Sequence, residues 1–197
     1  MRKAVVLTGL AVYFVLAAPA MFGQRIPDIA SPKHYQLTIS PDFASENFAG
    51  DETIQVDLLK PSASITLNAA EIKFAEVTIS ARGKTQTAQV TPDEKNEMVT
   101  FTVAEPLVAG PAEIRIRYSG ILNGQLRGLY LSKANNRKYA ITQLENTDAR
   151  RMYPSFDEPS YKATFDITAI IDKGDTAISN GKIISDTPGP GDGKHTL

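Results

Sequence analysis

The chain carries few side chains of the types that catalyse reactions, and their spacing excludes several kinds of site. Its two histidines, His34 and His195, lie near opposite ends of the sequence. They therefore lack the i, i+4 spacing that places two imidazoles of one helix on a zinc ion. Cysteine is absent, and neither a Gly-x-Ser-x-Gly elbow nor a phosphate-binding glycine loop occurs. We therefore expect no catalytic residue, no metal ligand and no cofactor within this chain.

An acidic pair, Asp157 and Glu158, comes directly before Pro159. Adjacent side chains of an extended chain point to opposite sides, so these carboxyl groups can act as general acid and base only if the backbone turns. Pro159 is compatible with such a turn. Arg150 and Arg151 are close in the sequence, however, and their guanidinium groups favour structural ion pairs over catalysis.

A second polar pair, Gln143 and Glu145, ends a segment that is expected to be extended. In a strand, Tyr139, Ile141, Gln143 and Glu145 would share one face, because side chains alternate between the two faces. Gln143 and Glu145 could then project together into a cleft. From the residues alone, the other interpretation is that they are ordinary polar residues at a strand end.

Alternating apolar residues predict that strands carry these side chains. The longer runs are Leu37–Ile39, Ile54–Leu58, Val99–Val103, Ile114–Tyr118 and Ala163–Ile171, and the shorter ones are Ser64–Leu67, Val77–Ser80 and Tyr139–Leu144. In the run from Ala163 to Ile171, the apolar side chains are expected to face the core. Turn-forming residues separate the runs, and no segment keeps helical spacing over three turns. The sequence therefore predicts an all-β fold, an antiparallel sandwich or a saddle-shaped pair of sheets.

The last residues predict an unfinished strand. Residues 187–193 read TPGPGDG, a flexible turn, and Lys194–Leu197 then has the character of a strand whose partner is missing. A strand without its partner leaves backbone groups unpaired and a sheet edge open. We expect the natural sequence to continue beyond Leu197.

Composition excludes nucleic acid as an expected partner. Of the 197 residues, 42% are hydrophobic and 22% are charged, which is typical of a globular chain. The formal net charge is -1 at pH 7. A charge so close to zero gives no long-range field that would attract a phosphate backbone or an anionic lipid surface.

Residues 1–24 have the layout of a secretory signal peptide. Arg2 and Lys3 precede an apolar run from Ala4 to Ala18, and small residues follow at the expected cleavage region. We expect cleavage between Ala20 and Gln24, a domain over residues 25–197, and export to the periplasm or the medium. An uncleaved anchor is the other interpretation, but the run is shorter than the roughly 20 residues of a spanning helix. No stable membrane anchor is therefore expected.

Residues 142–166 read TQLENTDARRMYPSFDEPSYKATFD. This stretch resembles the signature of the N-terminal β-domain of the M1 family of zinc aminopeptidases, the aminopeptidase N-like enzymes. In that family, Thr-Gln-x-Glu is followed by Asp-Ala-Arg and then by Pro-x-x-Asp-Glu-Pro. The similarity is dense over residues 128–181 and looser back to His34-Tyr35. Asn146 stands where the family often has proline or alanine, and Ser155 where many members have cysteine.

The resemblance implies a saddle-like β-domain that packs against a separate thermolysin-like domain. In the family, that second domain carries a His-Glu-x-x-His helix and a downstream glutamate, which bind zinc. This motif does not occur in the present sequence. The resemblance therefore implies the first domain of an exported enzyme that removes N-terminal residues from peptides, truncated before the zinc domain.

The resemblance also implies roles for the residues described above. Gln143 would line the pocket for the first substrate residue, and Glu145 would hold the free α-amino group of the peptide. A carboxylate suits that task, because an ammonium group offers three donors and a charge. The residues expected to brace this strand are Asp148, Arg150, Asp157, Glu158 and Pro159.

A different class of function also fits the sequence. The same fold could serve as a non-catalytic binding or scaffold module that acts through its exposed sheet. In that case a partner protein would complete the strand at Lys194–Leu197 by β-addition.

Overall fold

The computed structural model describes residues 25–197, and these residues form an all-β domain, as the sequence predicts. Helical structure in this range is limited to two short 3-10 turns, η1 (Glu94–Asn96) and η2 (Ala149–Arg151). No helix among the described residues is long and apolar enough to cross a membrane. The expected signal peptide lies outside the described residues.

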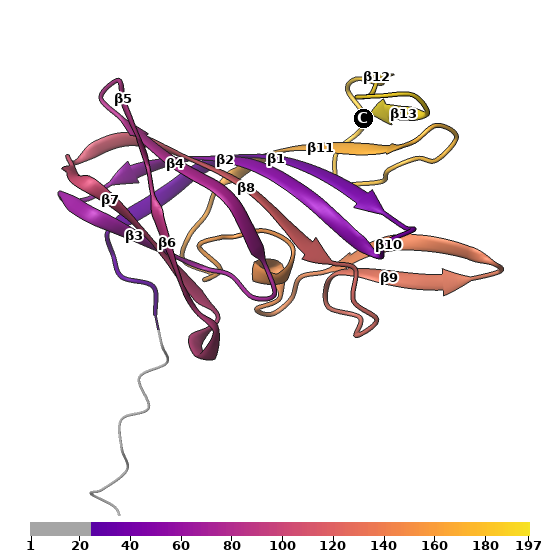
Figure 1. The fold of residues 1–197 in the computed structure, drawn as a ribbon, viewed down its shortest axis with the longest axis horizontal. Helices are drawn as coiled ribbons and strands as arrows, with labels where there is room; N and C mark the ends of the chain where they lie inside the picture. The colour runs from indigo at the N-terminus through magenta and orange to yellow at the C-terminus, as the bar shows by residue number, and fades with distance from the viewer. Residues whose placement is uncertain (1–24) are drawn as a thin grey trace, which may run out of the picture.

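The largest element is an eight-stranded sheet that runs across the whole molecule (Figure 1). Its strands, in sheet order, are β12 (Thr187–Pro188), β13 (Lys194–Thr196), β11 (Thr164–Asp172), β1 (Ala30–Asp42), β2 (Asn47–Leu58), β8 (Gly110–Ile121), β4 (Lys73–Ala81) and β5 (Lys84–Thr87). Neighbouring strands in this sheet pair antiparallel, except that β1 and β11 pair parallel. That parallel pair departs from the predicted antiparallel arrangement.

Two smaller sheets accompany the large one. The first consists of β3 (Ser62–Asn68), β7 (Met98–Leu107) and β6 (Gln89–Asp93), in that order. The second is a hairpin of β9 (Gly128–Ala134) and β10 (Arg137–Gln143). Figure 1 shows the three-stranded sheet near the β5 end of the large sheet and the hairpin projecting at the opposite end of the molecule.

The core lies between these layers, and strand alternation explains which side chains fill it. On β1 and β2, Tyr35 lies opposite Ile54 and Leu37 lies opposite Glu52, so these four side chains share one face. The buried members of the core from β7 and β8 are Val99, Phe101, Val103, Ile114, Ile116 and Tyr118. Burial of these side chains is the main contribution to stability in a domain without disulfides.

Strand β11 forms as predicted. The prediction that its apolar side chains face the core is wrong. Phe165 and Ile167 lie opposite Tyr35 and Leu37, on the inner face of the sheet, yet they are 44% and 51% exposed. The ring of Phe165 stacks on Tyr35 with centroids 4.7 Å apart. This face is left open because the second layer, within residues 25–197, does not extend under β11.

The expectation of an unpaired strand at Lys194–Leu197 is wrong. Strand β13 pairs with β11 over Ile170–Asp172 on one side and with β12 on the other. The first two residues of the TPGPGDG segment, Thr187 and Pro188, form β12 and pair with β13. This strand therefore offers no free edge for β-addition by another protein.

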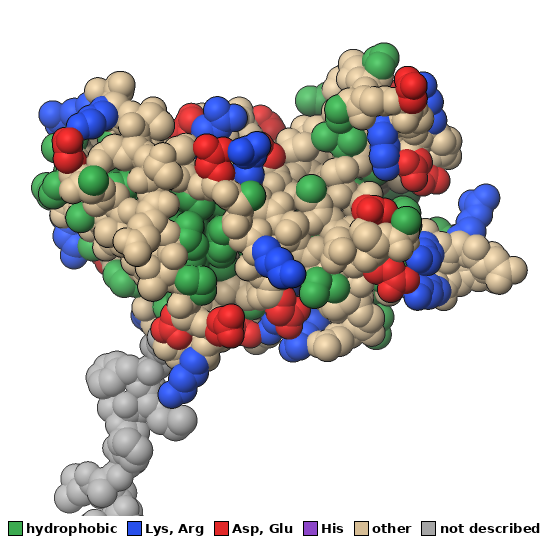
Figure 2. Space-filling view, viewed as in Figure 1, with side chains coloured by type: hydrophobic (Ala, Val, Ile, Leu, Met, Phe, Trp, Pro, Cys, Tyr) green, Lys and Arg blue, Asp and Glu red, His purple; other side chains and the backbone are tan. Residues whose placement is uncertain are grey.

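Charged side chains are scattered over the surface. On the face drawn in Figure 2, acidic and basic groups are interspersed, and neither sign forms a continuous field. Apolar side chains gather in a hollow of that view, and a groove of about 420 Å³ lies between β4 and β6. The groove is lined by residues that include Ile72, Phe74, Val77, Ala88 and Val90.

Candidate functional site

Gln143 is the last residue of β10, and it lies opposite Gly128, the first residue of β9. On the other face of this hairpin, Leu129 and Leu131 are buried in the core. The side chain of Gln143 is exposed and makes no hydrogen bond to any other described residue. The structure therefore presents this amide at the surface, on a strand end whose opposite face is fixed by packing.

Glu145 lies beyond the end of the strand, in a turn that we call the anchor turn, residues 144–148. The amide of Asp148 donates to the carbonyl of Leu144 at 3.0 Å and closes this turn, in which the Glu145–Asn146 peptide bond is cis. The strand alternation that was expected to align Glu145 with Gln143 stops at Gln143. The carboxylate of Glu145 is exposed and has no ion pair within residues 25–197.

Arg151, on η2, is held by three carboxylates. Its Nε donates to Asp148 Oδ1 at 2.8 Å, its Nη1 donates to Glu71 Oε1 at 2.8 Å, and its Nη2 pairs with Glu97. Burial lowers the pKa of Arg151, but the hydrogen bond to Asp148 and the charges of Glu71 and Glu97 raise it above its ordinary value. The guanidinium is therefore a permanent cation with every nitrogen engaged.

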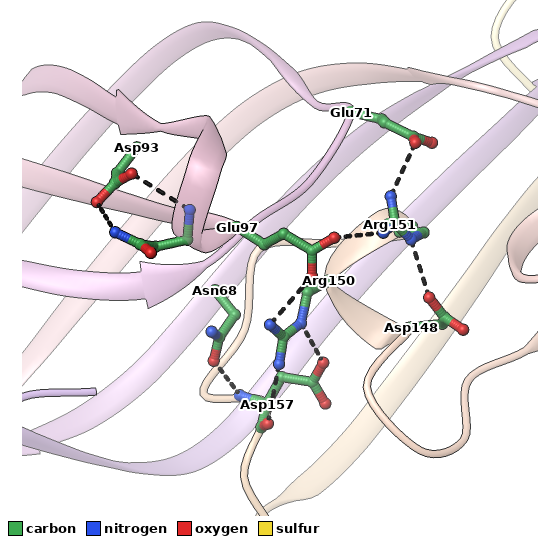
Figure 3. A network of polar contacts seen from close by, with 9 residues as sticks. Asn68, Glu71, Asp93, Glu97, Asp148, Arg150, Arg151 and Asp157 are labelled. Atoms are coloured by element: carbon green, nitrogen blue, oxygen red, sulfur yellow. Dashed lines mark hydrogen bonds and ion pairs between the residues drawn. The ribbon is translucent and has the colours of Figure 1, made fainter. Parts of the chain in front are cut away.

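Arg150 forms the second half of this network. Its Nε donates to Asp157 Oδ2 at 2.8 Å, and its Nη1 donates to Glu97 Oε2 at 3.3 Å. Glu97 thus lies between the two arginines and accepts from both (Figure 3). The side chains of Arg150 and Asp157 are only 11% and 12% exposed, so this pair is shielded from solvent and from salt.

Backbone contacts join the same segment to the three-stranded sheet. Asn68, the last residue of β3, forms an antiparallel bridge with Ser155, with N···O distances of 2.8 and 3.0 Å. The side-chain oxygen of Asn68 accepts the amide of Asp157 at 3.2 Å. The amide of Ala70 also donates to the carbonyl of Arg150 at 3.0 Å, so the Asp-Ala-Arg and Asp-Glu-Pro segments are both attached to the second layer of the domain.

Glu158 and Pro159 have different environments. The Oε1 atom of Glu158 accepts the amide of Ile26 at 2.7 Å, across 132 residues of sequence. Pro159 is exposed in the turn that follows, and the amide of Tyr161 donates to the carbonyl of Glu158 at 3.0 Å. Asp157 and Glu158 thus bind different partners, and the structure does not bring their carboxylates together as an acid and base pair.

The described residues do not fit a metal site. No group of three or more His, Cys, Asp or Glu side chains in residues 25–197 is placed to hold a metal ion. His34 instead contacts Thr164 and Asp166, and His195 contacts Asp186 and the carbonyl of Asp175.

Comparison with known proteins identifies the domain. A family model for the peptidase M1 N-terminal domain matches residues 31–197. The chain belongs to this family. Among its relatives, aminopeptidase M1-D of Oryza sativa subsp. japonica is 36% identical over 176 residues, which cover 86% of this chain and 20% of that protein. Aminopeptidase N of Acetobacter pasteurianus is 32% identical over 202 residues, which cover 95% of this chain and 56% of that protein.

The match to the M1 N-terminal domain family therefore confirms the resemblance that residues 142–166 indicated. The chain spans between a fifth and just over half of the length of these two relatives. Both relatives are named as aminopeptidases, so the family connects this domain with proteins that act on peptides.

Three residues of the arginine–carboxylate network in this M1 N-terminal domain were not predicted from the sequence as site residues. Arg151 was noted only as a neighbour of Arg150, and Glu71 and Glu97 gave no signal. These two glutamates lie in turns, at φ values of 61° and 52°, where no periodic pattern marks them. They are 80 and 54 residues from Arg151 in the sequence, so only the folded chain brings them together.

Glu52 is a further group that the sequence did not single out. Its side chain is fully buried on the inner face of β2, and neither carboxyl oxygen has a hydrogen-bond partner in the described part of the chain. Burial raises the pKa of Glu52 well above its ordinary value, and the charge of Asp51 adds to this shift. The Tyr118 hydroxyl is also buried without a partner, and burial together with Glu52 raises its pKa.

Proposed function

We propose that this M1 N-terminal domain forms the amine-binding part of an aminopeptidase substrate site. Glu145 binds the free α-amino group of a peptide, and Gln143 lines the pocket for the first side chain. The observation that carries the proposal is the contrast in pairing around the anchor turn. Four nearby carboxylates, from Glu71, Glu97, Asp148 and Asp157, are paired with arginine, whereas the exposed carboxylate of Glu145 is free.

The chemistry of an ammonium group explains why a free carboxylate is useful at this position. A substrate ammonium offers three donors and a positive charge, and a carboxylate accepts them in short, charge-assisted hydrogen bonds. An internal peptide segment has no ammonium group, so it would leave the carboxylate desolvated without a partner. A site of this kind therefore selects the N-terminus of a peptide.

The proposal assigns the bond-breaking chemistry to a part of the protein outside residues 25–197. In an M1 aminopeptidase, a bound zinc ion supplies Lewis-acid polarisation of the scissile carbonyl and an activated water. The described residues do not fit a zinc site, so the domain supplies binding and orientation only. The coverage of the relatives, at 20% and 56% of their lengths, supports a longer protein. The signal-like residues 1–24 support export to the periplasm or the medium.

Substitution of Glu145 in the complete enzyme tests this function. Glu145→Ala is expected to lower kcat/KM for peptides by about 1.5–3 kcal/mol in transition-state free energy, the worth of a hydrogen bond to a charged group. Glu105→Ala is the matched control, because Glu105 is also exposed and its side chain makes a surface ion pair with Lys84. Equal kinetics for Glu145→Ala, Glu105→Ala and the unmodified enzyme would remove Glu145 from the site.

A further inference from the structure

Arg151 ties the anchor turn to the rest of the domain through polar contacts, beside the packing of the partly buried Leu144 against the core. The turn closes at Asp148, whose amide donates to the Leu144 carbonyl at 3.0 Å. The carboxylate of the same Asp148 then accepts Arg151 Nε at 2.8 Å, and the Arg151 amide donates to the Asp148 carbonyl at 3.1 Å. Any movement of Arg151 is therefore passed to the residue that closes the turn.

The other two arms of Arg151 reach the second layer of the fold. Glu71 lies in the connection between β3 and β4, and Glu97 lies between η1 and β7. These carboxylates accept Nη1 and Nη2 of Arg151, and its side chain is only 8% exposed. The amide of Ala69 donates to the Glu97 carbonyl at 2.9 Å, so the two connections are also bound to each other. Through Arg151, the anchor turn is thus bonded to the connections at the ends of the three-stranded sheet.

Arg151 also packs against Gly128, the residue that lies opposite Gln143 in the hairpin. A Cβ atom on Gly128 would lie 2.6 Å from the Cβ of Arg151, so η2 packs directly on the start of β9. Gly128 is the hydrogen-bonding neighbour of Gln143 across the hairpin. One side chain therefore contacts the element opposite Gln143 and bonds the turn that carries Glu145.

We infer that Arg151 is a positioning residue that holds Glu145 and Gln143 at the spacing needed for the N-terminus of a peptide. This inference rests on the proposed function of Glu145. Arginine suits the role because its planar fork presents donors in three fixed directions, whereas lysine offers a mobile point charge. Since each nitrogen of Arg151 already donates to a different carboxylate, the fork does not neutralise Glu145, which stays free for a ligand ammonium.

The test compares two competitive inhibitors of the complete enzyme, L-leucine and 4-methylpentanoate, which is the same molecule without its amino group. The ratio of their inhibition constants measures recognition of the amine alone. Arg151→Lys is expected to reduce the preference for L-leucine by on the order of 10-fold, because a misplaced anchor loses its ligand contact. Asp148→Asn removes only one arm of the fork and is expected to act in the same direction with less effect on folding.

Matched variants distinguish positioning from a loss of stability. Arg117→Lys is the control, since Arg117 on β8 makes an exposed ion pair with Glu76 on β4 and, within the described residues, no hydrogen bond or ion pair with the anchor turn, so it should leave the preference unchanged. Faster hydrogen exchange of the Asp148 amide in Arg151→Lys and Asp148→Asn is expected as well, because that amide closes the turn.

Each result separates the inference from the function on which it rests. If Glu145→Ala abolishes the amine preference while Arg151→Lys and Asp148→Asn retain it, the positioning role is wrong and the function of Glu145 stands. If Arg151→Lys weakens both inhibitors equally, Arg151 serves stability alone, which also overturns the inference. If Glu145→Ala itself keeps the preference, the proposed function fails.

Discussion

Gly128 and Arg151 approach so closely that no side chain fits between them, and this contact lies directly behind Gln143. Gly128 adopts a φ of 66°, and a Cβ at this position would be 2.6 Å from the Cβ of Arg151. The backbone of Gly128, at the start of β9, therefore packs directly against the side chain of Arg151 on η2. The contact lies next to Gln143, because Gly128 is the residue opposite Gln143 in the hairpin.

The first prediction concerns Gly128→Ala. The left-handed φ alone costs about 1–3 kcal/mol for a residue with a Cβ, and the clash with Arg151 adds to it. Gly83→Ala is the matched control, because Gly83 has a φ of 77° with nothing within 4 Å of its added Cβ. Urea unfolding should show a larger loss of stability for Gly128→Ala than for Gly83→Ala. Equal losses would mean that the contact with Arg151 relaxes freely.

The second prediction concerns the shielded pair of Arg150 and Asp157. Arg150→Met leaves the carboxylate of Asp157 buried without its partner, which is expected to cost about 3–5 kcal/mol. Arg117→Met breaks an exposed pair with Glu76 and is expected to cost no more than about 1 kcal/mol. Denaturant unfolding at low and high salt checks both values. A small cost for Arg150→Met would show that water replaces the arginine.

The third prediction is a pH dependence of stability that arises from Glu52. Its pKa is raised in the folded state by burial, so the neutral form is favoured there. Its contribution to stability is complete below the unfolded pKa of about 4.3. That contribution is lost as the pH rises from the unfolded pKa to the folded pKa. Over this interval the free energy of unfolding falls by about 1.4 kcal/mol per pH unit.

Glu52→Gln isolates this effect, because the amide has the same shape and does not titrate. The free energy of unfolding, measured in urea from pH 5 upward, should fall more steeply with pH in the unmodified domain than in Glu52→Gln. Parallel curves for the two proteins would show that Glu52 is hydrated or paired in solution.

The fourth prediction concerns Ser155, which stands where many relatives are expected to have cysteine. Its hydroxyl is buried and has no hydrogen-bond partner in the described part of the chain. Removing an unsatisfied buried hydroxyl relieves its desolvation cost, so Ser155→Ala is expected to be neutral or stabilising by about 1 kcal/mol. Ser160→Ala, at an exposed position, should change nothing. A clear loss of stability in Ser155→Ala would indicate a water bound to the hydroxyl.

The alternating pattern that predicts strands is clearest where burial on one face imposes a period of two, although the exposed strands β10 and β11 were also predicted. The alternation at Ile54–Leu58 and Ile114–Tyr118 marks β2 and β8, which lie in the middle of the large sheet. Strand β5 reads KTQT and lies at the edge, where no buried face imposes a pattern. Alternation also carries no information on strand direction, so the parallel pairing of β1 with β11 was not predictable.

The candidate site was predicted only in its local part. Gln143, Glu145, Asp148 and Arg150 lie within eight consecutive residues, and the family resemblance of that segment identified them. The carboxylates that complete the network come from turns more than 50 residues away. A charged residue in a turn has no periodicity and is usually solvated, so nothing in its sequence context distinguishes Glu97 from any other surface glutamate.

The parallel pairing of β1 with β11 has a consequence for biosynthesis. His34 and Thr164 are neighbours in the sheet but are separated by 130 residues of chain. Ribosomes add about 5–20 residues per second, so the newly made β1 waits on the order of 10 seconds for the strand that covers its second edge. An uncovered edge pairs readily with other chains. The nascent polypeptide is therefore most exposed to misassembly between the completion of β1–β2 and the emergence of Thr164.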